Sequence, residues 1–144
     1  MAVNFFFQEI KITLSGRNRL KQFVEQLFKA EKKTLVSINY IFCSDTNLLV
    51  INQQFLKHDY YTDTITFNLS NNPHDIEGEV YISVDRVREN AQKLNTTLKE
   101  ELYRIIFHGT LHLCGYKDKT IKEKRRMTKA EDKYLRSYFI DGST

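Results

Sequence analysis

Hydrophobic positions along this chain follow two periods, and each period predicts a different kind of element. Alternating or short apolar stretches predict strands at residues 3–12, 35–43, 64–69 and 79–83. For the second strand we expect one buried face, formed by Val36, Ile38, Tyr40 and Phe42. Turn-forming residues occupy 71–78, so the third and fourth strands are predicted to form a hairpin.

Helical spacing of apolar residues, preceded each time by a residue suited to capping, predicts five helices. The expected N-caps are Ser15, Ser44, Ser83, Thr97 and Thr120. Thr97 and Thr120 each stand three residues before a glutamate, which predicts reciprocal capping boxes. The helix that Thr97 opens should run to about Leu113, with Gly115 as its left-handed stop. These elements predict an α+β fold: a single mixed sheet of about four strands, with helices packed mainly on one face.

Composition indicates one globular domain over residues 1–144, with 41% apolar and 28% charged residues. No apolar run approaches the length of a membrane span, and the N-terminal segment does not resemble a signal peptide. We therefore expect a cytoplasmic protein in which Cys43 and Cys114 stay reduced. The net charge of +4 is compatible with a polyanionic partner but does not require one.

The candidate chemistry lies at the end of the predicted helix 98–113. His108 and His112 are four residues apart, so their imidazoles project from adjacent turns of one face, where two histidines can share a metal ion. Cys114 points away from this pair. Asp118 follows the stop at Gly115 and is free to return toward the histidines as a third ligand. The competing interpretation is a chance histidine pair with a solvated Asp118.

Around these histidines the chain resembles a known family. The segment His108-Gly-Thr-Leu-His112-Leu-Cys-Gly-Tyr116 is similar to the signature H-G-x-L-H-L-x-G-Y of the YbeY family of bacterial rRNA-maturation endoribonucleases. Further blocks resemble that family in the same order, within a similarity that spans about residues 36–135: Ile51-Asn52 with Asp59, Thr62–Phe67, and Gly78–Ser83.

The resemblance implies an α+β fold, a metal ion held by three side chains, and hydrolysis of single-stranded RNA. It further implies maturation of the 3′ end of small-subunit rRNA, ribosome quality control, and the ribosome as a partner. Two positions depart from the family pattern. Asp118 stands where the family has its third histidine ligand, and Leu56 stands where it has an arginine suited to phosphate. Zinc is the expected ion, although a carboxylate ligand also suits iron or manganese.

The predicted mechanism depends on the ion. A helical zinc protease would read H-E-x-x-H, but Gly109 replaces the glutamate that would act as general base, so a peptidase is disfavoured. We expect the metal to activate a water molecule and polarise a phosphoryl oxygen, with the RNA 2′-hydroxyl as an alternative nucleophile. Lys57, His58 and Lys117 are candidates for binding phosphate.

A second hypothesis is a non-catalytic RNA- or ribosome-binding module that keeps the fold and the metal site. The aspartate ligand and the missing arginine favour it. The basic run 122–126 on the last predicted helix is either a solvated surface or a contact for RNA phosphates.

Overall fold

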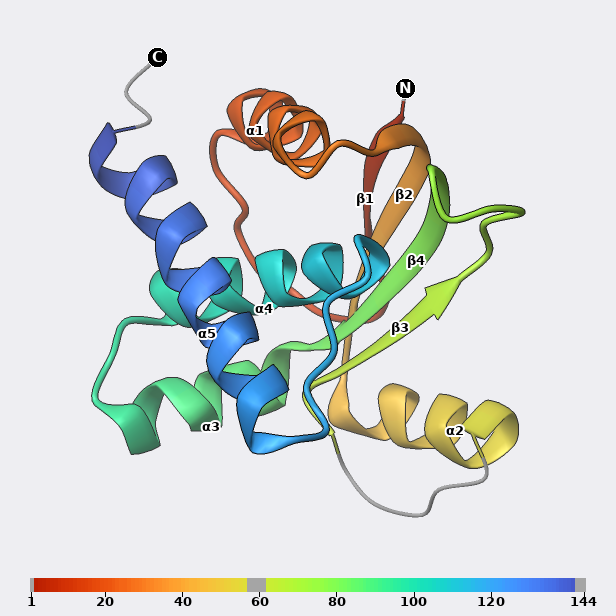
Figure 1. The fold of residues 1–144 in the computed structure, drawn as a ribbon. Helices are drawn as coiled ribbons and strands as arrows, with labels where there is room; N and C mark the ends of the chain where they lie inside the picture. Colours follow the sequence, from red (N-terminus) through yellow and green to blue (C-terminus); the bar gives the residue numbers. More distant parts are fainter. Residues whose placement is uncertain (1, 57–61, 142–144) are drawn as a thin grey trace.

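The structure is a computed structural model that describes residues 2–56 and 62–141 (Figure 1). Its elements are β1 (Val3–Phe7), α1 (Arg17–Ala30), β2 (Thr34–Cys43), α2 (Asp45–Leu56), β3 (Thr64–Asn68), β4 (Asp75–Ser83), α3 (Val84–Leu94), α4 (Leu98–Leu113), α5 (Ile121–Arg136) and a short π-helical turn, Ser137–Asp141.

The strands form one mixed sheet in the order β1-β2-β4-β3. β1, β2 and β4 are parallel, whereas β3 pairs with β4 in the antiparallel direction and forms one edge of the sheet. The predicted hairpin and the predicted mixed sheet of four strands are therefore confirmed.

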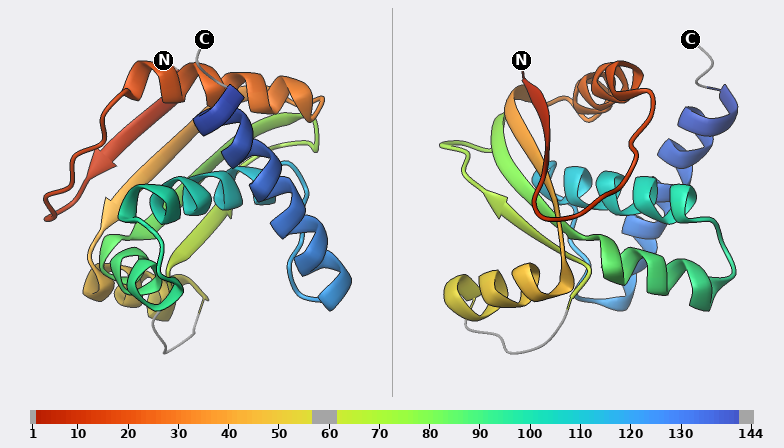
Figure 2. Two further views of the ribbon diagram at one scale, coloured as in Figure 1. Left: turned by 90° about the vertical axis from the view of Figure 1, so that its left-hand side faces the viewer. Right: turned by 180° about the vertical axis from the view of Figure 1, so that it is seen from behind.

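The helices lie mainly on one face of the sheet, as predicted (Figures 1 and 2). α1, α3, α4 and α5 share one buried cluster with the inward side chains of the strands. α2 packs on the other face through a smaller cluster of Cys43, Leu48 and Ile65. None of the helices in the described part of the chain combines the length and the apolar character that a membrane span requires.

α4 lies close against the sheet, and two contacts fix its position. A Cβ atom at Gly109 would come within 2.5 Å of Cγ1 of Val80, so only glycine allows this approach to β4. At the next residue, the buried hydroxyl of Thr110 forms a hydrogen bond of 2.5 Å with that of Tyr40 in β2. These contacts set the rotation of α4 and therefore the direction in which its other face points. Five positions at helical spacing on α4 are buried: Leu102, Ile105, Ile106, Gly109 and Leu113.

The first strand and the first helix differ from the prediction. β1 ends at Phe7, well before residue 12, because its partner β2 ends at Cys43, one residue beyond the pairing of Phe7 with Phe42. Ser15 is not the N-cap of α1. Gly16 occupies that position with a φ of 65° and no side-chain cap, and the carbonyl of Ser15 accepts a hydrogen bond from Tyr103.

The start of β2 also differs from the prediction. Val36 was expected on the buried face but is 52% exposed, because the register against β4 shifts between Leu35 and Ser37. A β-bulge of this kind changes the side to which the preceding residues point. Beyond the irregularity Ile38, Tyr40 and Phe42 are buried as predicted.

The ends of several elements follow the predicted capping chemistry. The side chains of Ser44, Ser83 and Thr97 each accept a hydrogen bond from a backbone N–H of the helix that follows. Thr120 and Glu123 form a complete capping box at the start of α5. The box predicted at Thr97 is only half formed in the described structure, because the Glu100 side chain makes no return bond to the backbone of Thr97. The strand β4, however, begins at Asp75 rather than residue 79, because its pairing with β2 starts at Thr34.

Candidate metal centre

His108 and His112 lie side by side on the exposed edge of α4. Their Nε2 atoms are 3.0 Å apart, and their rings are nearly perpendicular. The side chains are 19% and 26% exposed, so each is held by packing but remains reachable from solvent. The spacing of four residues therefore places the two Nε2 atoms close enough to share one ligand.

The loop between α4 and α5 places Asp118 opposite this pair. The chain reverses at Gly115, whose φ of 104° is a conformation that residues with a Cβ rarely adopt. The N–H groups of Gly115 and Tyr116 donate back to the last turn of α4, and the capping box at Thr120 holds the other end of the loop. As a result, Oδ2 of Asp118 is 3.3 Å from Nε2 of His108 and 3.2 Å from Nε2 of His112.

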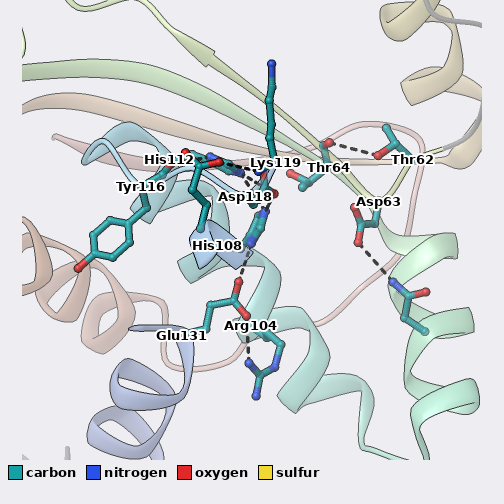
Figure 3. A network of polar contacts seen from close by, with 12 residues as sticks. Thr62, Asp63, Thr64, Arg104, His108, His112, Tyr116, Asp118, Lys119 and Glu131 are labelled. Carbon is teal, nitrogen blue, oxygen red and sulfur yellow. Dashed lines mark hydrogen bonds and ion pairs between the residues drawn. The ribbon is translucent and has the colours of Figure 1, made fainter. Parts of the chain in front are cut away.

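The far nitrogen of each imidazole is held by an acceptor (Figure 3). Nδ1 of His108 is 2.6 Å from Oε2 of Glu131, and Nδ1 of His112 is 3.0 Å from the backbone carbonyl of Tyr116. A carbonyl and a carboxylate only accept hydrogen bonds, so both Nδ1 atoms donate. In the neutral rings, both Nε2 atoms therefore carry free lone pairs that face Asp118.

This donor set fits a metal ion. Two imidazole lone pairs and a carboxylate oxygen converge within 4.8 Å of one another. Three acceptors so close repel unless a cation lies among them. Ligands about 2.0–2.1 Å from a shared zinc-like ion are themselves roughly 3.0–3.4 Å apart, which matches the three separations in the site. Three protein ligands leave room for a further ligand, as in catalytic rather than structural sites.

Glu131 connects the site to a buried ion pair. It is 6% exposed; its Oε1 accepts from Arg104, and its Oε2 accepts from His108. Arg104 also donates to Asp132. Burial lowers the pKa of His108, but the hydrogen bond and the negative charge of Glu131 outweigh it and raise that pKa.

Sequence reasoning missed Glu131 and Arg104. A signal for Glu131 is present in the sequence, because it lies four residues after Met127 and three before Tyr134, and apolar residues at this helical spacing predict the inward face of the helix. A carboxylate in such a place needs a buried partner.

A pocket of about 480 Å³ opens next to the three ligands, between α2, β3, α4 and the loop of Asp118. Leu56, at the position where the family has an arginine, lines it, and so does Asp63, whose carboxylate accepts from Asn90. Thr66 contributes a buried hydroxyl that has no hydrogen-bond partner in the described part of the chain. No lysine or arginine is among the described residues that line this pocket.

The other residues considered from the sequence have different outcomes. Lys57 and His58 lie outside the described residues. Lys117 is exposed and does not line the pocket in the part of the chain that the structure describes. Cys114 is buried apart from the ligands, and burial raises the pKa of its thiol to about 12, so it is a poor metal ligand at neutral pH.

The fold and the donor set define a class: an α+β protein in which two histidines and an aspartate form a cluster that could hold one metal ion. Residues 5–139 match the family model described as Endoribonuclease YbeY. Endoribonuclease YbeY of Cytophaga hutchinsonii is 48% identical over 91% of this chain and 92% of its own, and that of Flavobacterium psychrophilum is 42% identical over 94% and 96%. The solution structure of a Thermotoga maritima protein, 30% identical, covers 96% of this chain and 90% of its own with a TM-score of 0.68. The chain belongs to the YbeY family.

Proposed function

We propose that this protein is a metal-dependent endoribonuclease that cleaves single-stranded RNA. The observation that carries the proposal is the triangle of His108, His112 and Asp118 at the mouth of a pocket, in a chain whose relatives are named Endoribonuclease YbeY. Residues 1–144 act as one domain in the cytoplasm. The substrate is ribosomal RNA, at the 3′ end of the small-subunit species, with a further role in ribosome quality control on the ribosome itself.

The ligands we assign are His108, His112 and Asp118, and the ion we assign is zinc. Zinc accepts both imidazole nitrogen and carboxylate oxygen, and it tolerates the irregular three-ligand sites that catalysis uses. The carboxylate of Asp118 moves the preference toward harder ions, so iron and manganese are the competitors that a metal analysis must include.

The reaction chemistry divides between the ion and the chain. A bound divalent ion supplies Lewis acidity, which polarises a phosphoryl oxygen and makes a coordinated water more acidic. Glu131 and the carbonyl of Tyr116 fix the two imidazoles, so that little reorganisation is needed during the reaction. Thr66 lines the same pocket, but its hydroxyl is buried under α4, where a Cβ at Gly109 would come within 3.4 Å of it.

Gly109 explains why this helix carries no H-E-x-x-H glutamate. Any Cβ there would collide with Val80 of β4, so the position faces the sheet rather than the pocket. A general base must therefore come from elsewhere or be dispensable. Water and the RNA 2′-hydroxyl remain the two nucleophiles to separate, and the product ends distinguish them: hydrolysis leaves no cyclic phosphate, whereas attack by the 2′-hydroxyl produces a 2′,3′-cyclic phosphate.

The second candidate function is an RNA- or ribosome-binding module without catalysis. One observation favours it: Leu56 lines the pocket in place of an arginine, and the described lining contains no cation to stabilise charge on a phosphoryl group.

One experiment separates the two functions. The purified protein is incubated with end-labelled single-stranded RNA and with the matching duplex, with added zinc, manganese or chelator, beside the His112→Ala variant and the surface variant Lys93→Ala. We expect cleavage of the single strand alone, loss of cleavage in chelator and in His112→Ala, and full activity in Lys93→Ala. If the protein binds the RNA but leaves it intact with every ion tested, the result would instead support the non-catalytic binding module.

A further inference from the structure

The positive charge of this protein is concentrated in one segment. The whole chain carries 22 basic and 18 acidic residues, a net charge of +4. Residues 117–136 alone contain nine basic and four acidic residues, a net of +5, which leaves 13 basic against 14 acidic residues, or −1, for the rest. The excess that makes the protein basic therefore lies entirely in α5 and the loop that carries Asp118.

The acidic residues of this segment are all engaged with specific partners. Asp118 belongs to the metal centre, and Glu123 forms the capping box. Glu131 and Asp132 both pair with Arg104 of α4. Asp118, Glu123 and Glu131 therefore neutralise little of the outer surface of the helix. Asp132 is exposed and lies on the outer side of α5, three residues after Lys129, where its carboxylate is paired with Arg104.

The outer surface of α5 carries a row of cations. Positions 122, 125, 129 and 136 fall on one side of a helix, opposite the buried Met127, Ala130 and Tyr134. We call this row the outer basic face: Lys122, Arg125, Lys129 and Arg136. All four side chains are exposed, none forms an ion pair within the described part of the chain, and the row extends over about 21 Å.

The pocket needs such a surface. Its described lining contains the carboxylates of Asp63 and Asp118 but no lysine or arginine, whereas RNA carries a negative charge at every phosphate. A single bound ion offsets only part of that repulsion. Among the described residues, the cations that could provide affinity for a strand therefore lie outside the pocket, and their excess is on α5 and the loop before it.

α5 begins only three residues after Asp118 of the metal centre. α5 starts directly after the loop of Asp118, and Lys119 extends from that loop (Figures 1 and 3). The guanidinium of Arg126 lies 4.9 Å from the ring centroid of Tyr116, whose carbonyl holds His112. Basic side chains thus continue from the rim of the site onto the helix.

We propose that the outer basic face binds the phosphates of the substrate RNA strand beyond the nucleotides that occupy the pocket. This inference rests on the proposed function, since it assigns a path to the same RNA. It predicts that the protein holds long single strands much better than short ones, through contacts that depend on charge and not on base sequence.

The test is a matched pair of triple variants of the full chain. The first removes three cations from the outer basic face by Lys122→Gln, Arg125→Gln and Lys129→Gln. The control removes the same charge from exposed positions elsewhere by Lys11→Gln, Lys29→Gln and Lys93→Gln. Circular dichroism and thermal unfolding check that both fold. Binding of a long fluorescein-labelled single-stranded RNA is then measured by anisotropy over a range of salt concentrations, with a gel to verify that the probe stays intact.

We expect the outer-face variant to bind the long RNA roughly 100-fold more weakly at 0.1 M salt, with a log–log salt slope smaller by about 2, and the control to change far less. Cleavage of an RNA only a few nucleotides long should proceed equally in all three proteins. Equal binding of long RNA by the two triple variants would overturn the inference. Binding is measured apart from cleavage, so a failure of the enzyme hypothesis would be seen separately. In that case the RNA would stay intact, and the outer-face variant would still bind it more weakly than the control.

Discussion

Nδ1 of His108 lies 2.6 Å from Oε2 of Glu131, a carboxylate that is almost completely buried and is also bound to Arg104. The pair links α4 to α5 across the interior of the protein. It fixes the ring of His108 and directs its Nε2 toward His112 and Asp118. The geometry of the metal centre thus depends on a residue that does not touch the ion.

The substitution Glu131→Gln tests this dependence. Both carboxylate oxygens are acceptors, one from His108 and one from Arg104, but glutamine offers a single acceptor oxygen. One of the two donors must then face an NH₂ group. We expect zinc affinity, measured by competition with a chromophoric chelator, to fall about 10- to 100-fold.

Asp132→Asn is the matched control, because Asp132 binds Arg104 from the exposed side and does not contact either histidine. It should leave zinc affinity close to that of the parent protein. Equal affinities for Glu131→Gln and the parent would show that the ring of His108 is held adequately without Glu131.

Asp118 offers a test of the ligand set. Asp118→Ala removes the oxygen that lies 3.2–3.3 Å from both Nε2 atoms, whereas Asp118→His restores the ligand type of the family pattern. We expect calorimetric titration with zinc to show a loss of affinity in the alanine variant and retention in the histidine variant. The histidine variant should discriminate more strongly against manganese, since nitrogen replaces a hard oxygen ligand. Zinc binding by Asp118→Ala at parental affinity would remove Asp118 from the ligand set.

Gly109→Ala should destabilise the fold although alanine is the better helix former. The added Cβ would lie 2.5 Å from Cγ1 of Val80, a fully buried and stiff β-branched side chain. Overpacking costs about 1–3 kcal/mol, against a gain of about 1 kcal/mol in helix propensity. Urea unfolding should report a net loss. Combining it with Val80→Ala should recover part of that loss, and strictly additive effects would indicate that the two residues do not collide.

Thr66→Val should separate stability from activity. The hydroxyl of Thr66 is buried and unpartnered in the described structure, so its near-isosteric replacement by a methyl group should raise the free energy of unfolding by about 1 kcal/mol. Because protein atoms cover the hydroxyl, RNA cleavage should stay close to that of the parent protein, and a several-fold loss would show that the hydroxyl reaches the substrate. Thr64→Val provides the contrast, because Thr64 donates to the carbonyl of Tyr81 and should lose stability. A more stable Thr66→Val enzyme with unchanged cleavage would exclude a substrate contact.

The sequence predicts those residues of the site that lie close to one another along the chain. His108 and His112 are related by one helical turn, and Asp118 follows within a few residues, with Gly115 marking the reversal between them. Glu131 lies 23 residues from His108, and the contact exists only because α5 crosses α4 at that point. Its spacing from Met127 and Tyr134 is a signal for a buried position, but no local pattern identifies its partner.

The same division holds for the fold. Caps at Ser44, Ser83, Thr97 and Thr120 depend on hydrogen bonds within a few residues, and they were found where expected. The end of β1 and the exposure of Val36 depend on the neighbouring strand, through its length and a register shift. Hydrophobic alternation along a single strand contains no information on the length of the neighbouring strand or on a register shift.

The most direct test of the metal centre is elemental analysis of the protein purified without an affinity-chelate step, beside the variant His108→Ala/His112→Ala. We predict about one equivalent of zinc, or of another transition metal, in the parent chain and none in the variant. A parent chain that carries no metal and takes up none on titration would contradict this prediction, and would leave the RNA-binding module as the better description of this protein.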